Sequence, residues 1–206
     1  MKNLKVTTTI FAMAFVALTV MSCKDNKKET ASDMHNMDMS HHDDANATMD
    51  YDQMASTDAR PMNAQQASQT KQVLASYMAI KDALVNDDGN AAQKAGKQLE
   101  TALSTFDVSS YTAEQQTELK DIIADARENA EHISESKIDH QREHFKILSE
   151  DMLDMVAITG AGGTIYQLYC PMYDKGSSWL SMSKDIKNPF YGSKMLTCGK
   201  VEKEIN

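Results

Sequence analysis

Four runs of apolar residues at helical spacing, separated by short breaks, constrain the fold of this chain more than any other feature. Apolar side chains three and four positions apart lie on one face of an α-helix, so each run predicts an amphipathic helix. Between residues 66 and 160 the four apolar faces comprise Val73, Tyr77, Ile80 and Leu84; Ala95, Leu99, Ala102, Leu103 and Phe106; Leu119, Ile122, Ala126, Ala130 and Ile133; and Ile138, Phe145, Leu148, Met152 and Met155. Because short connections join these helices, they predict a four-helix antiparallel bundle over residues 65–160.

The breaks between the runs carry helix-end signals. Asp87-Asp88-Gly89-Asn90 ends the first helix, which we expect at residues 66–87. Thr112 followed by Gln115 matches a capping box, in which two side chains bond the free N–H groups at a helix start, and it opens the third helix. Residues 134–139 separate the third helix from the fourth, which ends at Gly160-Ala161-Gly162-Gly163.

The pattern changes after these glycines. Residues 164–170 are rich in β-forming side chains, and Asn188-Pro189 and Gly192 indicate turns. Aromatic residues gather in this part of the chain: Tyr166, Tyr169, Tyr173, Trp179, Phe190 and Tyr191. We expect residues 161–206 to form a small loop-rich section with one or two short β-strands, packed on the bundle. The predicted fold class is therefore mainly α.

The N-terminus has the features of an export signal. Lys2 and Lys5 precede an apolar run over residues 10–21, which is shorter than the about 20 residues that a transmembrane helix needs but fits a signal peptide. The run ends just before Cys23 and resembles a bacterial lipoprotein cleavage box. We expect a signal peptide at residues 1–22 and lipidation at Cys23. These features predict a protein of the cell envelope, lipid-anchored to a bacterial membrane and facing the periplasm or the exterior; the alternative is a soluble secreted protein.

Residues 23–64 are polar and acidic without sustained apolar spacing, which predicts a disordered tether. The chain has 15 Met and 6 His but only 3 Cys, and the tether holds a dense group of them: Met34, His35, Met37, Met39, His41 and His42. Imidazole suits Cu(II) and thioether suits Cu(I), so this Met/His/Asp-rich segment is typical of weak copper capture. The alternative is a solvated spacer with an accidental bias in composition.

Charge and motif content narrow the class of function. The formal net charge is −9, without a basic cluster, so a nucleic acid is not expected as a partner and cations are favoured. The sequence shows neither a nucleophile constellation nor a phosphate-binding loop. We therefore expect a binding protein and not an enzyme.

Two sulfur pairs lie in the C-terminal section. Cys170 and Met172 are close in sequence, as are Met195 and Cys198. Thiolate and thioether are soft donors, so convergence of the two pairs would suit Cu(I). The cysteines could equally form a structural disulfide, and the methionines could be plain core residues. The pattern leaves these alternatives open.

Three histidines are further candidates. His140 and His144 are spaced i, i+4, so one helix face could present both to a single metal ion, although surface histidines are commoner. We keep this pair as a second choice of metal ligands, with zinc as the ion in that case. His132 lies near the expected turn between the third and fourth helices, from which it could approach the C-terminal section.

Several segments carry a family resemblance. They are Glu131-His132-Ile133, Gln141-Arg142 with Phe145, Tyr169-Cys170-Pro171-Met172, Trp179-Leu180-Ser181, Asn188-Pro189-Phe190-Tyr191-Gly192 and Met195-Leu196-Thr197-Cys198-Gly199. Together they resemble the family called domain of unknown function 3347, over about residues 66–203. Its members are bacterial envelope proteins, often lipoproteins, and similar domains are fused to adaptor subunits of heavy-metal efflux pumps. The resemblance implies metal handling, with copper favoured, and marks His132, Cys170, Met172, Met195 and Cys198 as candidate ligands.

The sequence thus predicts an envelope lipoprotein that binds a copper ion, as Cu(I), for sequestration or for hand-over to a heavy-metal efflux adaptor or a cuproprotein. The rival hypothesis is an interaction module without a metal, stapled by a disulfide between Cys170 and Cys198.

Overall fold

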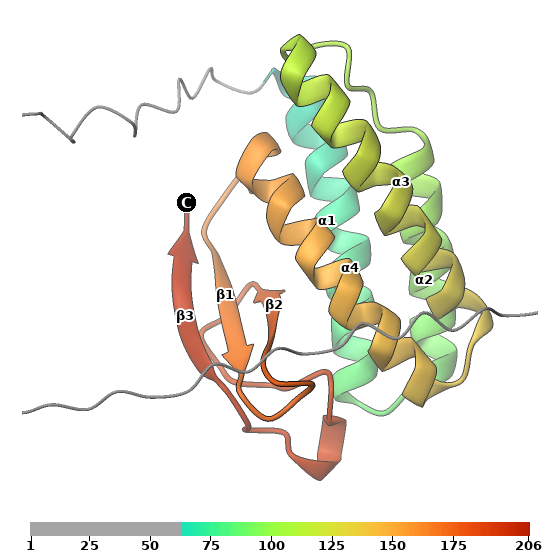
Figure 1. Cartoon of the computed structure of the whole chain (residues 1–206), viewed down its shortest axis with the longest axis vertical. Coiled ribbons are helices and arrows are strands. Elements are labelled where there is room, and N and C mark those ends of the chain that lie inside the picture. The colour runs from blue at the N-terminus through green and yellow to red at the C-terminus, as the bar shows by residue number, and fades with distance from the viewer. Residues whose placement is uncertain (1–62) are drawn as a thin grey trace, which may run out of the picture. The chain divides into compact units, whose positions relative to one another are not determined.

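The computed structural model describes residues 63–206 (Figure 1). Four helices come first: α1 (Ala64–Val85), α2 (Gly89–Ser104), α3 (Ala113–Glu135) and α4 (Ile138–Thr159). They are followed by β1 (Ile165–Cys170), β2 (Ser177–Ser181), the 3-10 turn η1 (Gly192–Lys194) and β3 (Lys200–Ile205). The mainly α fold class with C-terminal strands is confirmed, with one strand more than the one or two expected.

The N-terminal predictions fall outside the described residues. They are the signal peptide at 1–22, lipidation of Cys23, the tail ligands between Met34 and His42, and all but the last two residues of the tether at 23–64. Among residues 63–206, none of the helices has the length and apolar character that crossing a membrane requires.

Local chemistry explains where the helices begin and end. Thr112 and Gln115 form the predicted capping box at α3, and Asn63 with Gln66 forms a second one that starts α1 slightly earlier than expected. The Asp88 side chain accepts from the Ala91 N–H at the start of α2. At the end of α4, Gly160 has a φ of 70°, a conformation that favours glycine. The predicted breaks between helices are thus real helix ends.

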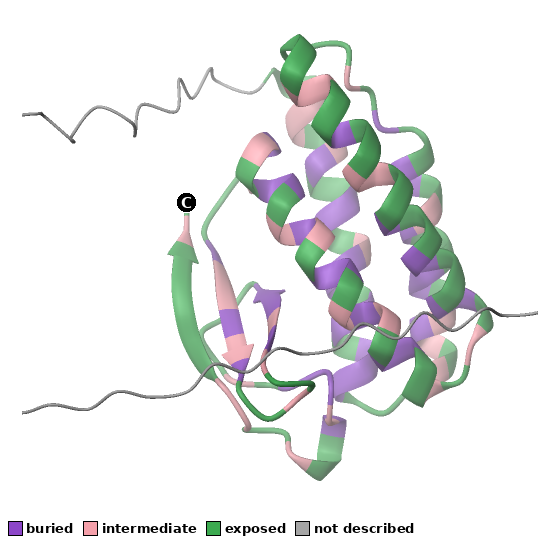
Figure 2. Cartoon of the chain, viewed as in Figure 1, coloured by how far each residue is buried: buried purple, intermediate pink, exposed green. Residues whose placement is uncertain are grey.

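Sequential helices pack side by side, and their apolar faces meet in one core (Figure 2). Of the apolar positions predicted for the four faces, only Ile122 and Ile138 are partly exposed. Helices α2 and α3 approach each other closely at Gly96, where an added Cβ would lie 2.9 Å from the Ala130 carbonyl oxygen. A glycine here lets the two backbones come together.

The three strands form an antiparallel sheet in the order β2-β1-β3. Strand β2 packs against α4, so the sheet lies beside that helix (Figure 1). Leu168 of β1 and Trp179 and Leu180 of β2 are buried, whereas the residues of β3 are exposed apart from the half-buried Ile205. The sheet therefore contributes to the core through β1 and β2.

Aromatic and polar contacts join the sheet to the bundle. The buried Tyr77 hydroxyl lies 2.8 Å from Ser149 Oγ and accepts from the Leu180 N–H at 3.1 Å, while burial raises the pKa of Tyr77 far above its ordinary value. The Phe145 ring stacks on Tyr77 at 5.1 Å between centroids and meets Phe190 at 5.9 Å. This joint makes the C-terminal section part of the folded unit.

The buried Arg142 holds the two parts together from α4. Its side chain donates to the Pro189 carbonyl at 3.1 Å and to the Leu84 carbonyl at 3.1 Å, and it forms an ion pair with Asp87. The guanidinium thereby connects α4, the end of α1 and the loop before η1. Because its charge is paired and its Nε and Nη2 atoms donate hydrogen bonds, much of the cost of burying this group is offset.

Candidate metal centre

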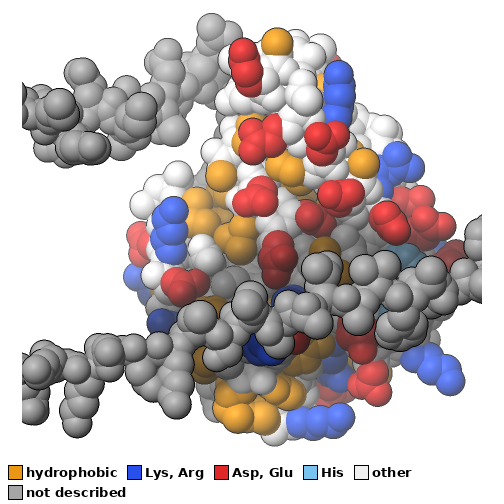
Figure 3. Space-filling model, viewed as in Figure 1, with side chains coloured by type: hydrophobic (Ala, Val, Ile, Leu, Met, Phe, Trp, Pro, Cys, Tyr) orange, Lys and Arg blue, Asp and Glu red, His pale blue; other side chains and the backbone are white. Residues whose placement is uncertain are grey.

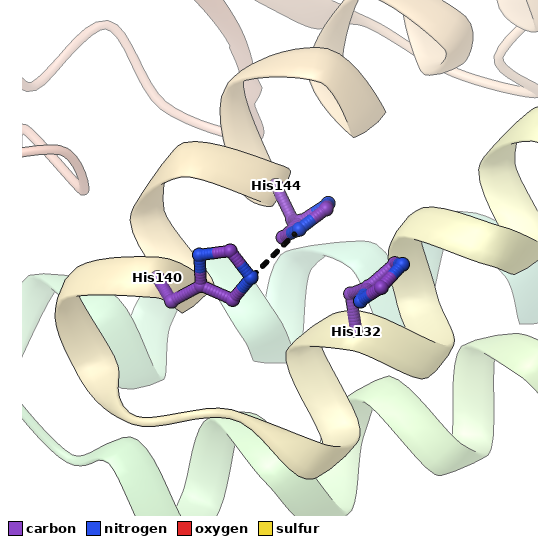
Figure 4. A group of neighbouring side chains, drawn as sticks. All are labelled: His132, His140 and His144. Carbon is purple, nitrogen blue, oxygen red and sulfur yellow. Dashed lines mark hydrogen bonds between the residues drawn. The ribbon is translucent and has the colours of Figure 1, made fainter. Parts of the chain in front are cut away.

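Three histidines converge where α3 ends and α4 begins (Figure 4). His132 lies in the last turn of α3, and His140 and His144 lie in the first two turns of α4. One ring nitrogen of each lies within 4.8 Å of the other two. His132, predicted to act with the C-terminal sulfurs, thus joins the pair that was the second choice of ligands.

The buried Gln141 fixes the turn that brings these histidines together. Its side-chain amide nitrogen lies 3.0 Å from the carbonyl oxygens of Ile133 and Ser136, and also 3.0 Å from that of Gly89. The first two carbonyls belong to the end of α3 and the turn itself, whereas Gln141 belongs to α4. Its amide therefore holds the last turn of α3 against the first turn of α4, where the imidazoles are.

The hydrogen bonds of Asn129 set the tautomer of His144. The Asn129 amide nitrogen donates to the Asp125 carbonyl at 3.0 Å and lies 3.3 Å from Asp151 Oδ2. Both partners only accept, so the Asn129 oxygen faces His144, whose Nδ1 lies 3.0 Å away. The Nδ1 atom of His144 must carry the proton in this bond, which leaves the lone pair on Nε2.

His140 is oriented in the same way by a carboxylate. Its Nδ1 lies 2.8 Å from Glu143 Oε2, which accepts, so Nδ1 carries the proton, and in the neutral ring Nε2 holds the lone pair. The two Nε2 atoms, of His140 and His144, lie 3.1 Å apart. In a tetrahedral site with metal–nitrogen bonds of 2.0–2.1 Å the nitrogens lie roughly 3.3 Å apart. In two neutral rings the lone pairs face each other at this distance; a proton shared in a hydrogen bond between the rings, as drawn in Figure 4, or a bound metal ion would relieve the contact.

His132 is near these nitrogens but not yet aligned with them. Its ring stacks on His144 with centroids 4.2 Å apart and planes 8° apart. The two rings are seen nearly parallel in Figure 4. An ion in the plane of the His144 ring lies out of the plane of a parallel ring, so His132 has to turn in order to bind it. Its side chain is 48% exposed, which leaves room for that rotation.

The surroundings of His144 keep its ring neutral. Burial, followed by the neighbouring His132 and His140, lowers the pKa of His144, so its ring is neutral at pH 7 and available as a ligand. The carboxylates of Glu128 and Glu143 act on the same ring in the opposite sense. Further acidic side chains are exposed over α3 and α4 (Figure 3).

Asn129 also contacts a carboxylate, that of Asp151. Burial, with added repulsion from Asp125, raises the pKa of Asp151 to about 6. The chain of contacts runs from Asp151 through Asn129 to His144, which resembles the carboxylate partners that orient metal-binding histidines. Sequence spacing identified His140 and His144, but Asn129 and Glu143 were missed, although each lies three residues from a histidine on its own helix.

The C-terminal cysteines also meet in space. Cys170 is buried at the end of β1, Cys198 is partly exposed, and their Sγ atoms are 2.8 Å apart. Met172 is 62% exposed and Met195 is partly exposed. The structure thus brings the two thiols together, as the disulfide prediction requires, whereas the Cu(I) prediction also requires Met172 and Met195 to converge on them, and Met172 is largely exposed.

Comparison with known proteins gives one result. A family model described as "Protein of unknown function (DUF3347)" matches residues 73–164, a range that includes all three histidines and ends before the cysteines. Neither the curated proteins nor the solved structures gave a match. The match confirms the resemblance for the helical part of the chain. The part of the chain that carries the three histidines is therefore similar to the DUF3347 family.

Proposed function

We propose that this protein binds a copper ion at His132, His140 and His144 and serves to sequester or hand over copper at the cell envelope. The observation that carries the proposal is the pair of Nε2 atoms 3.1 Å apart, each left with a lone pair because its Nδ1 is already bonded. Such a pair, with a third imidazole beside it, is arranged to receive a cation.

The donor set supports a late first-row metal. Imidazole binds zinc and copper well, whereas magnesium and calcium prefer oxygen ligands. Zinc is therefore the competing ion, since three histidines also form known types of zinc site. Copper is favoured by the Met/His tail between Met34 and His42 and by the heavy-metal context that the family resemblance implies.

The position of the centre supports transfer and not permanent storage. His140 and His132 are about half exposed, so an incoming ligand can reach the ion. Three protein ligands leave a fourth coordination position open, and a residue of an acceptor protein can bind the ion there before the histidines release it. We propose a heavy-metal efflux adaptor or a cuproprotein as the acceptor, a lipid anchor at Cys23, and a tail that raises the local copper concentration. Binding, and not catalysis, is the proposed role.

A titration of the full chain tests this proposal. Copper(II) and zinc(II) are each added in competition with a coloured chelator, to the wild type and to the His140→Gln/His144→Gln double variant. We expect the double variant to lose the tightest copper equivalent. The matched control is His41→Gln/His42→Gln, which removes two histidines of the tail and should keep that equivalent. Equal copper affinity in the wild type and the His140→Gln/His144→Gln variant contradicts the proposal. If the wild type binds zinc more tightly than copper, zinc and not copper is the ion of this site.

A further inference from the structure

The two cysteines lie where the C-terminal strand joins the sheet. Cys170 is the last residue of β1, and Cys198 lies two residues before β3 begins. The last pair of the β1–β3 ladder at this end is Tyr169 with Lys200. Just beyond that pair the two strands carry their Sγ atoms into contact at 2.8 Å.

Packing on both sides holds Cys198 in this place. The Asn188 side chain donates to the Cys198 carbonyl at 2.7 Å, and the Cys198 N–H donates to the Met195 carbonyl at 3.1 Å. Gly199 has a φ of 149°, and a Cβ there would lie 2.9 Å from the Trp179 ring and 3.0 Å from the Tyr169 carbonyl. The segment is thus pressed against the sheet, and the thiols separate only if it moves.

The arrangement favours a covalent bond over a shared ion. Two thiolates that bind one tetrahedral metal at about 2.3 Å keep their sulfurs roughly 3.8 Å apart, well beyond the observed contact. The hydrogen bond with Cys170, followed by burial, raises the pKa of Cys198 to about 11. Metal binding and attack on a disulfide both require the thiolate, so this raised pKa slows either reaction at neutral pH, and it is the short distance between the sulfurs that argues against a shared ion.

We infer that Cys170 and Cys198 are a thiol–disulfide pair, with Cys198 as the attacking thiol and Cys170 as the resolving thiol. The order follows from access, since Cys170 is fully buried and Cys198 is partly exposed. The inference rests on the geometry of the sulfurs and is independent of the proposed metal centre.

The reaction is exchange with an external disulfide, R–S–S–R. Cys198 loses its proton, attacks one sulfur of R–S–S–R and expels one RS⁻, which leaves a mixed disulfide on Cys198. Cys170 then loses its proton, attacks Cys198 Sγ and expels the second RS⁻. Two S–H bonds break and one Sγ–Sγ bond forms, while the two released protons convert the expelled groups to two R–SH. The protein is oxidised by two electrons and the external disulfide is reduced by two.

A disulfide between Cys170 and Cys198 would anchor β3 to the end of β1. The bond joins the end of β1 to the residue before Gly199 and β3, whose side chains are exposed and bury little apolar surface. It also closes the loop that contains Trp179 and Phe190, which pack against each other at 5.7 Å between ring centroids. A disulfide formed here by exchange therefore also stabilises the packing of Trp179 and Phe190 beside α4.

The test uses the full chain with Cys23→Ser, so that Cys170 and Cys198 are its only thiols. The reduced protein is incubated with oxidised glutathione and analysed by mass spectrometry and by peptide mapping without reductant. We expect the loss of two hydrogen atoms and a cross-linked peptide pair. Two persistent free thiols in excess oxidised glutathione overturn the inference, as does stoichiometric Cu(I) bound by thiols that resist oxidation.

Two single variants test the order of attack. Cys170→Ser should accumulate a glutathione adduct on Cys198, because the resolving thiol is missing, whereas Cys198→Ser should stay unmodified while folded. Equal adduct formation by both variants contradicts the assigned order. Circular dichroism checks that each variant is folded, and the peptide map of the parent chain remains decisive if either variant is not.

Discussion

Two polar side chains outside the predicted ligand set decide which histidine nitrogens can bind a metal. Asn129 and Glu143 each accept a hydrogen bond from an Nδ1 atom, and in the neutral rings this leaves the lone pairs on both Nε2 atoms. A histidine without such a partner can rotate and can exchange its tautomer, so part of its binding free energy is lost in ordering the ring. The affinity of the centre should therefore depend on these partners as well as on the ligands.

Replacing Asn129 tests this dependence. Asn129→Ala keeps a good helix former but removes the acceptor of the His144 Nδ1 proton. We expect copper affinity to fall roughly 10- to 100-fold, the usual cost of losing a partner of a metal-binding histidine. Nitrogen NMR of the metal-free protein should show that His144 no longer prefers the Nδ1–H tautomer.

Glu131→Gln is a suitable control, because it changes an exposed residue two positions along the same helix. It should leave the tautomer of His144 unchanged and should cost little affinity. A His144 tautomer that is the same in Asn129→Ala and in the wild type would show that the hydrogen bond does not set it. Because the NMR measurement uses the metal-free protein, it separates this claim from the proposed function.

Prediction from sequence worked at the residue scale where spacing alone was sufficient. The i, i+4 interval of His140 and His144 indicates a shared helix face, and the helix confirms it. The place of His132 could not be predicted, because it depends on how α4 folds back on α3 and on the three contacts of Gln141. Such contacts between a side chain and distant carbonyls leave no periodic signal in a sequence.

At the scale of elements, the close approach of α2 and α3 supports the position of His132. Gly96 faces the Ala130 carbonyl and the Ser134 N–H on the stretch of α3 that carries His132 between them. A Cβ at this glycine would lie 2.9 Å from the first and 3.1 Å from the second, and backbone atoms cannot rotate away. The helices can relieve the contact only by separating.

Gly96→Ala should therefore destabilise the protein. Overpacking of this kind costs about 1–3 kcal/mol, against a gain of about 1 kcal/mol from replacing glycine within a helix. We expect a net loss on the order of 1 kcal/mol in the free energy of unfolding, measured by urea denaturation. Gly163→Ala is the control, since an added Cβ there meets nothing within 4 Å. If the two variants have the same free energy of unfolding, α2 and α3 can move apart at little cost, which would contradict this prediction.

The elements themselves differ in how well the sequence predicts them. The four helices were predicted close to their observed bounds, because long apolar periods and capping residues coincide at their ends. Strand β3 was missed because Lys200-Val201-Glu202-Lys203-Glu204 is charged and exposed, so burial leaves no alternation to detect. Its pairing with β1 supplies the backbone hydrogen bonds that hold it.

At the scale of the whole folded unit, α4 links the proposed metal centre to the proposed thiol pair. Its first two turns carry His140 and His144, and Arg142 between them reaches the Pro189 carbonyl in the loop that Cys170 and Cys198 would close. Phe145, one residue after His144, packs against Phe190 of that loop. The sequence predicted a bundle with a packed aromatic section, but placing the histidines and the thiols as two separate groups required the three-dimensional structure.

The central claim is that the three imidazoles bind the copper ion, and electron paramagnetic resonance tests it most directly. The sample is the full chain loaded with one equivalent of copper(II), with the tail ligands Met34, His35, Met37, Met39, His41 and His42 substituted so that they cannot contribute. The account predicts nitrogen couplings from three imidazoles, which are lost in His140→Gln/His144→Gln. A spectrum without imidazole couplings, or one that this double variant leaves unchanged, would contradict it.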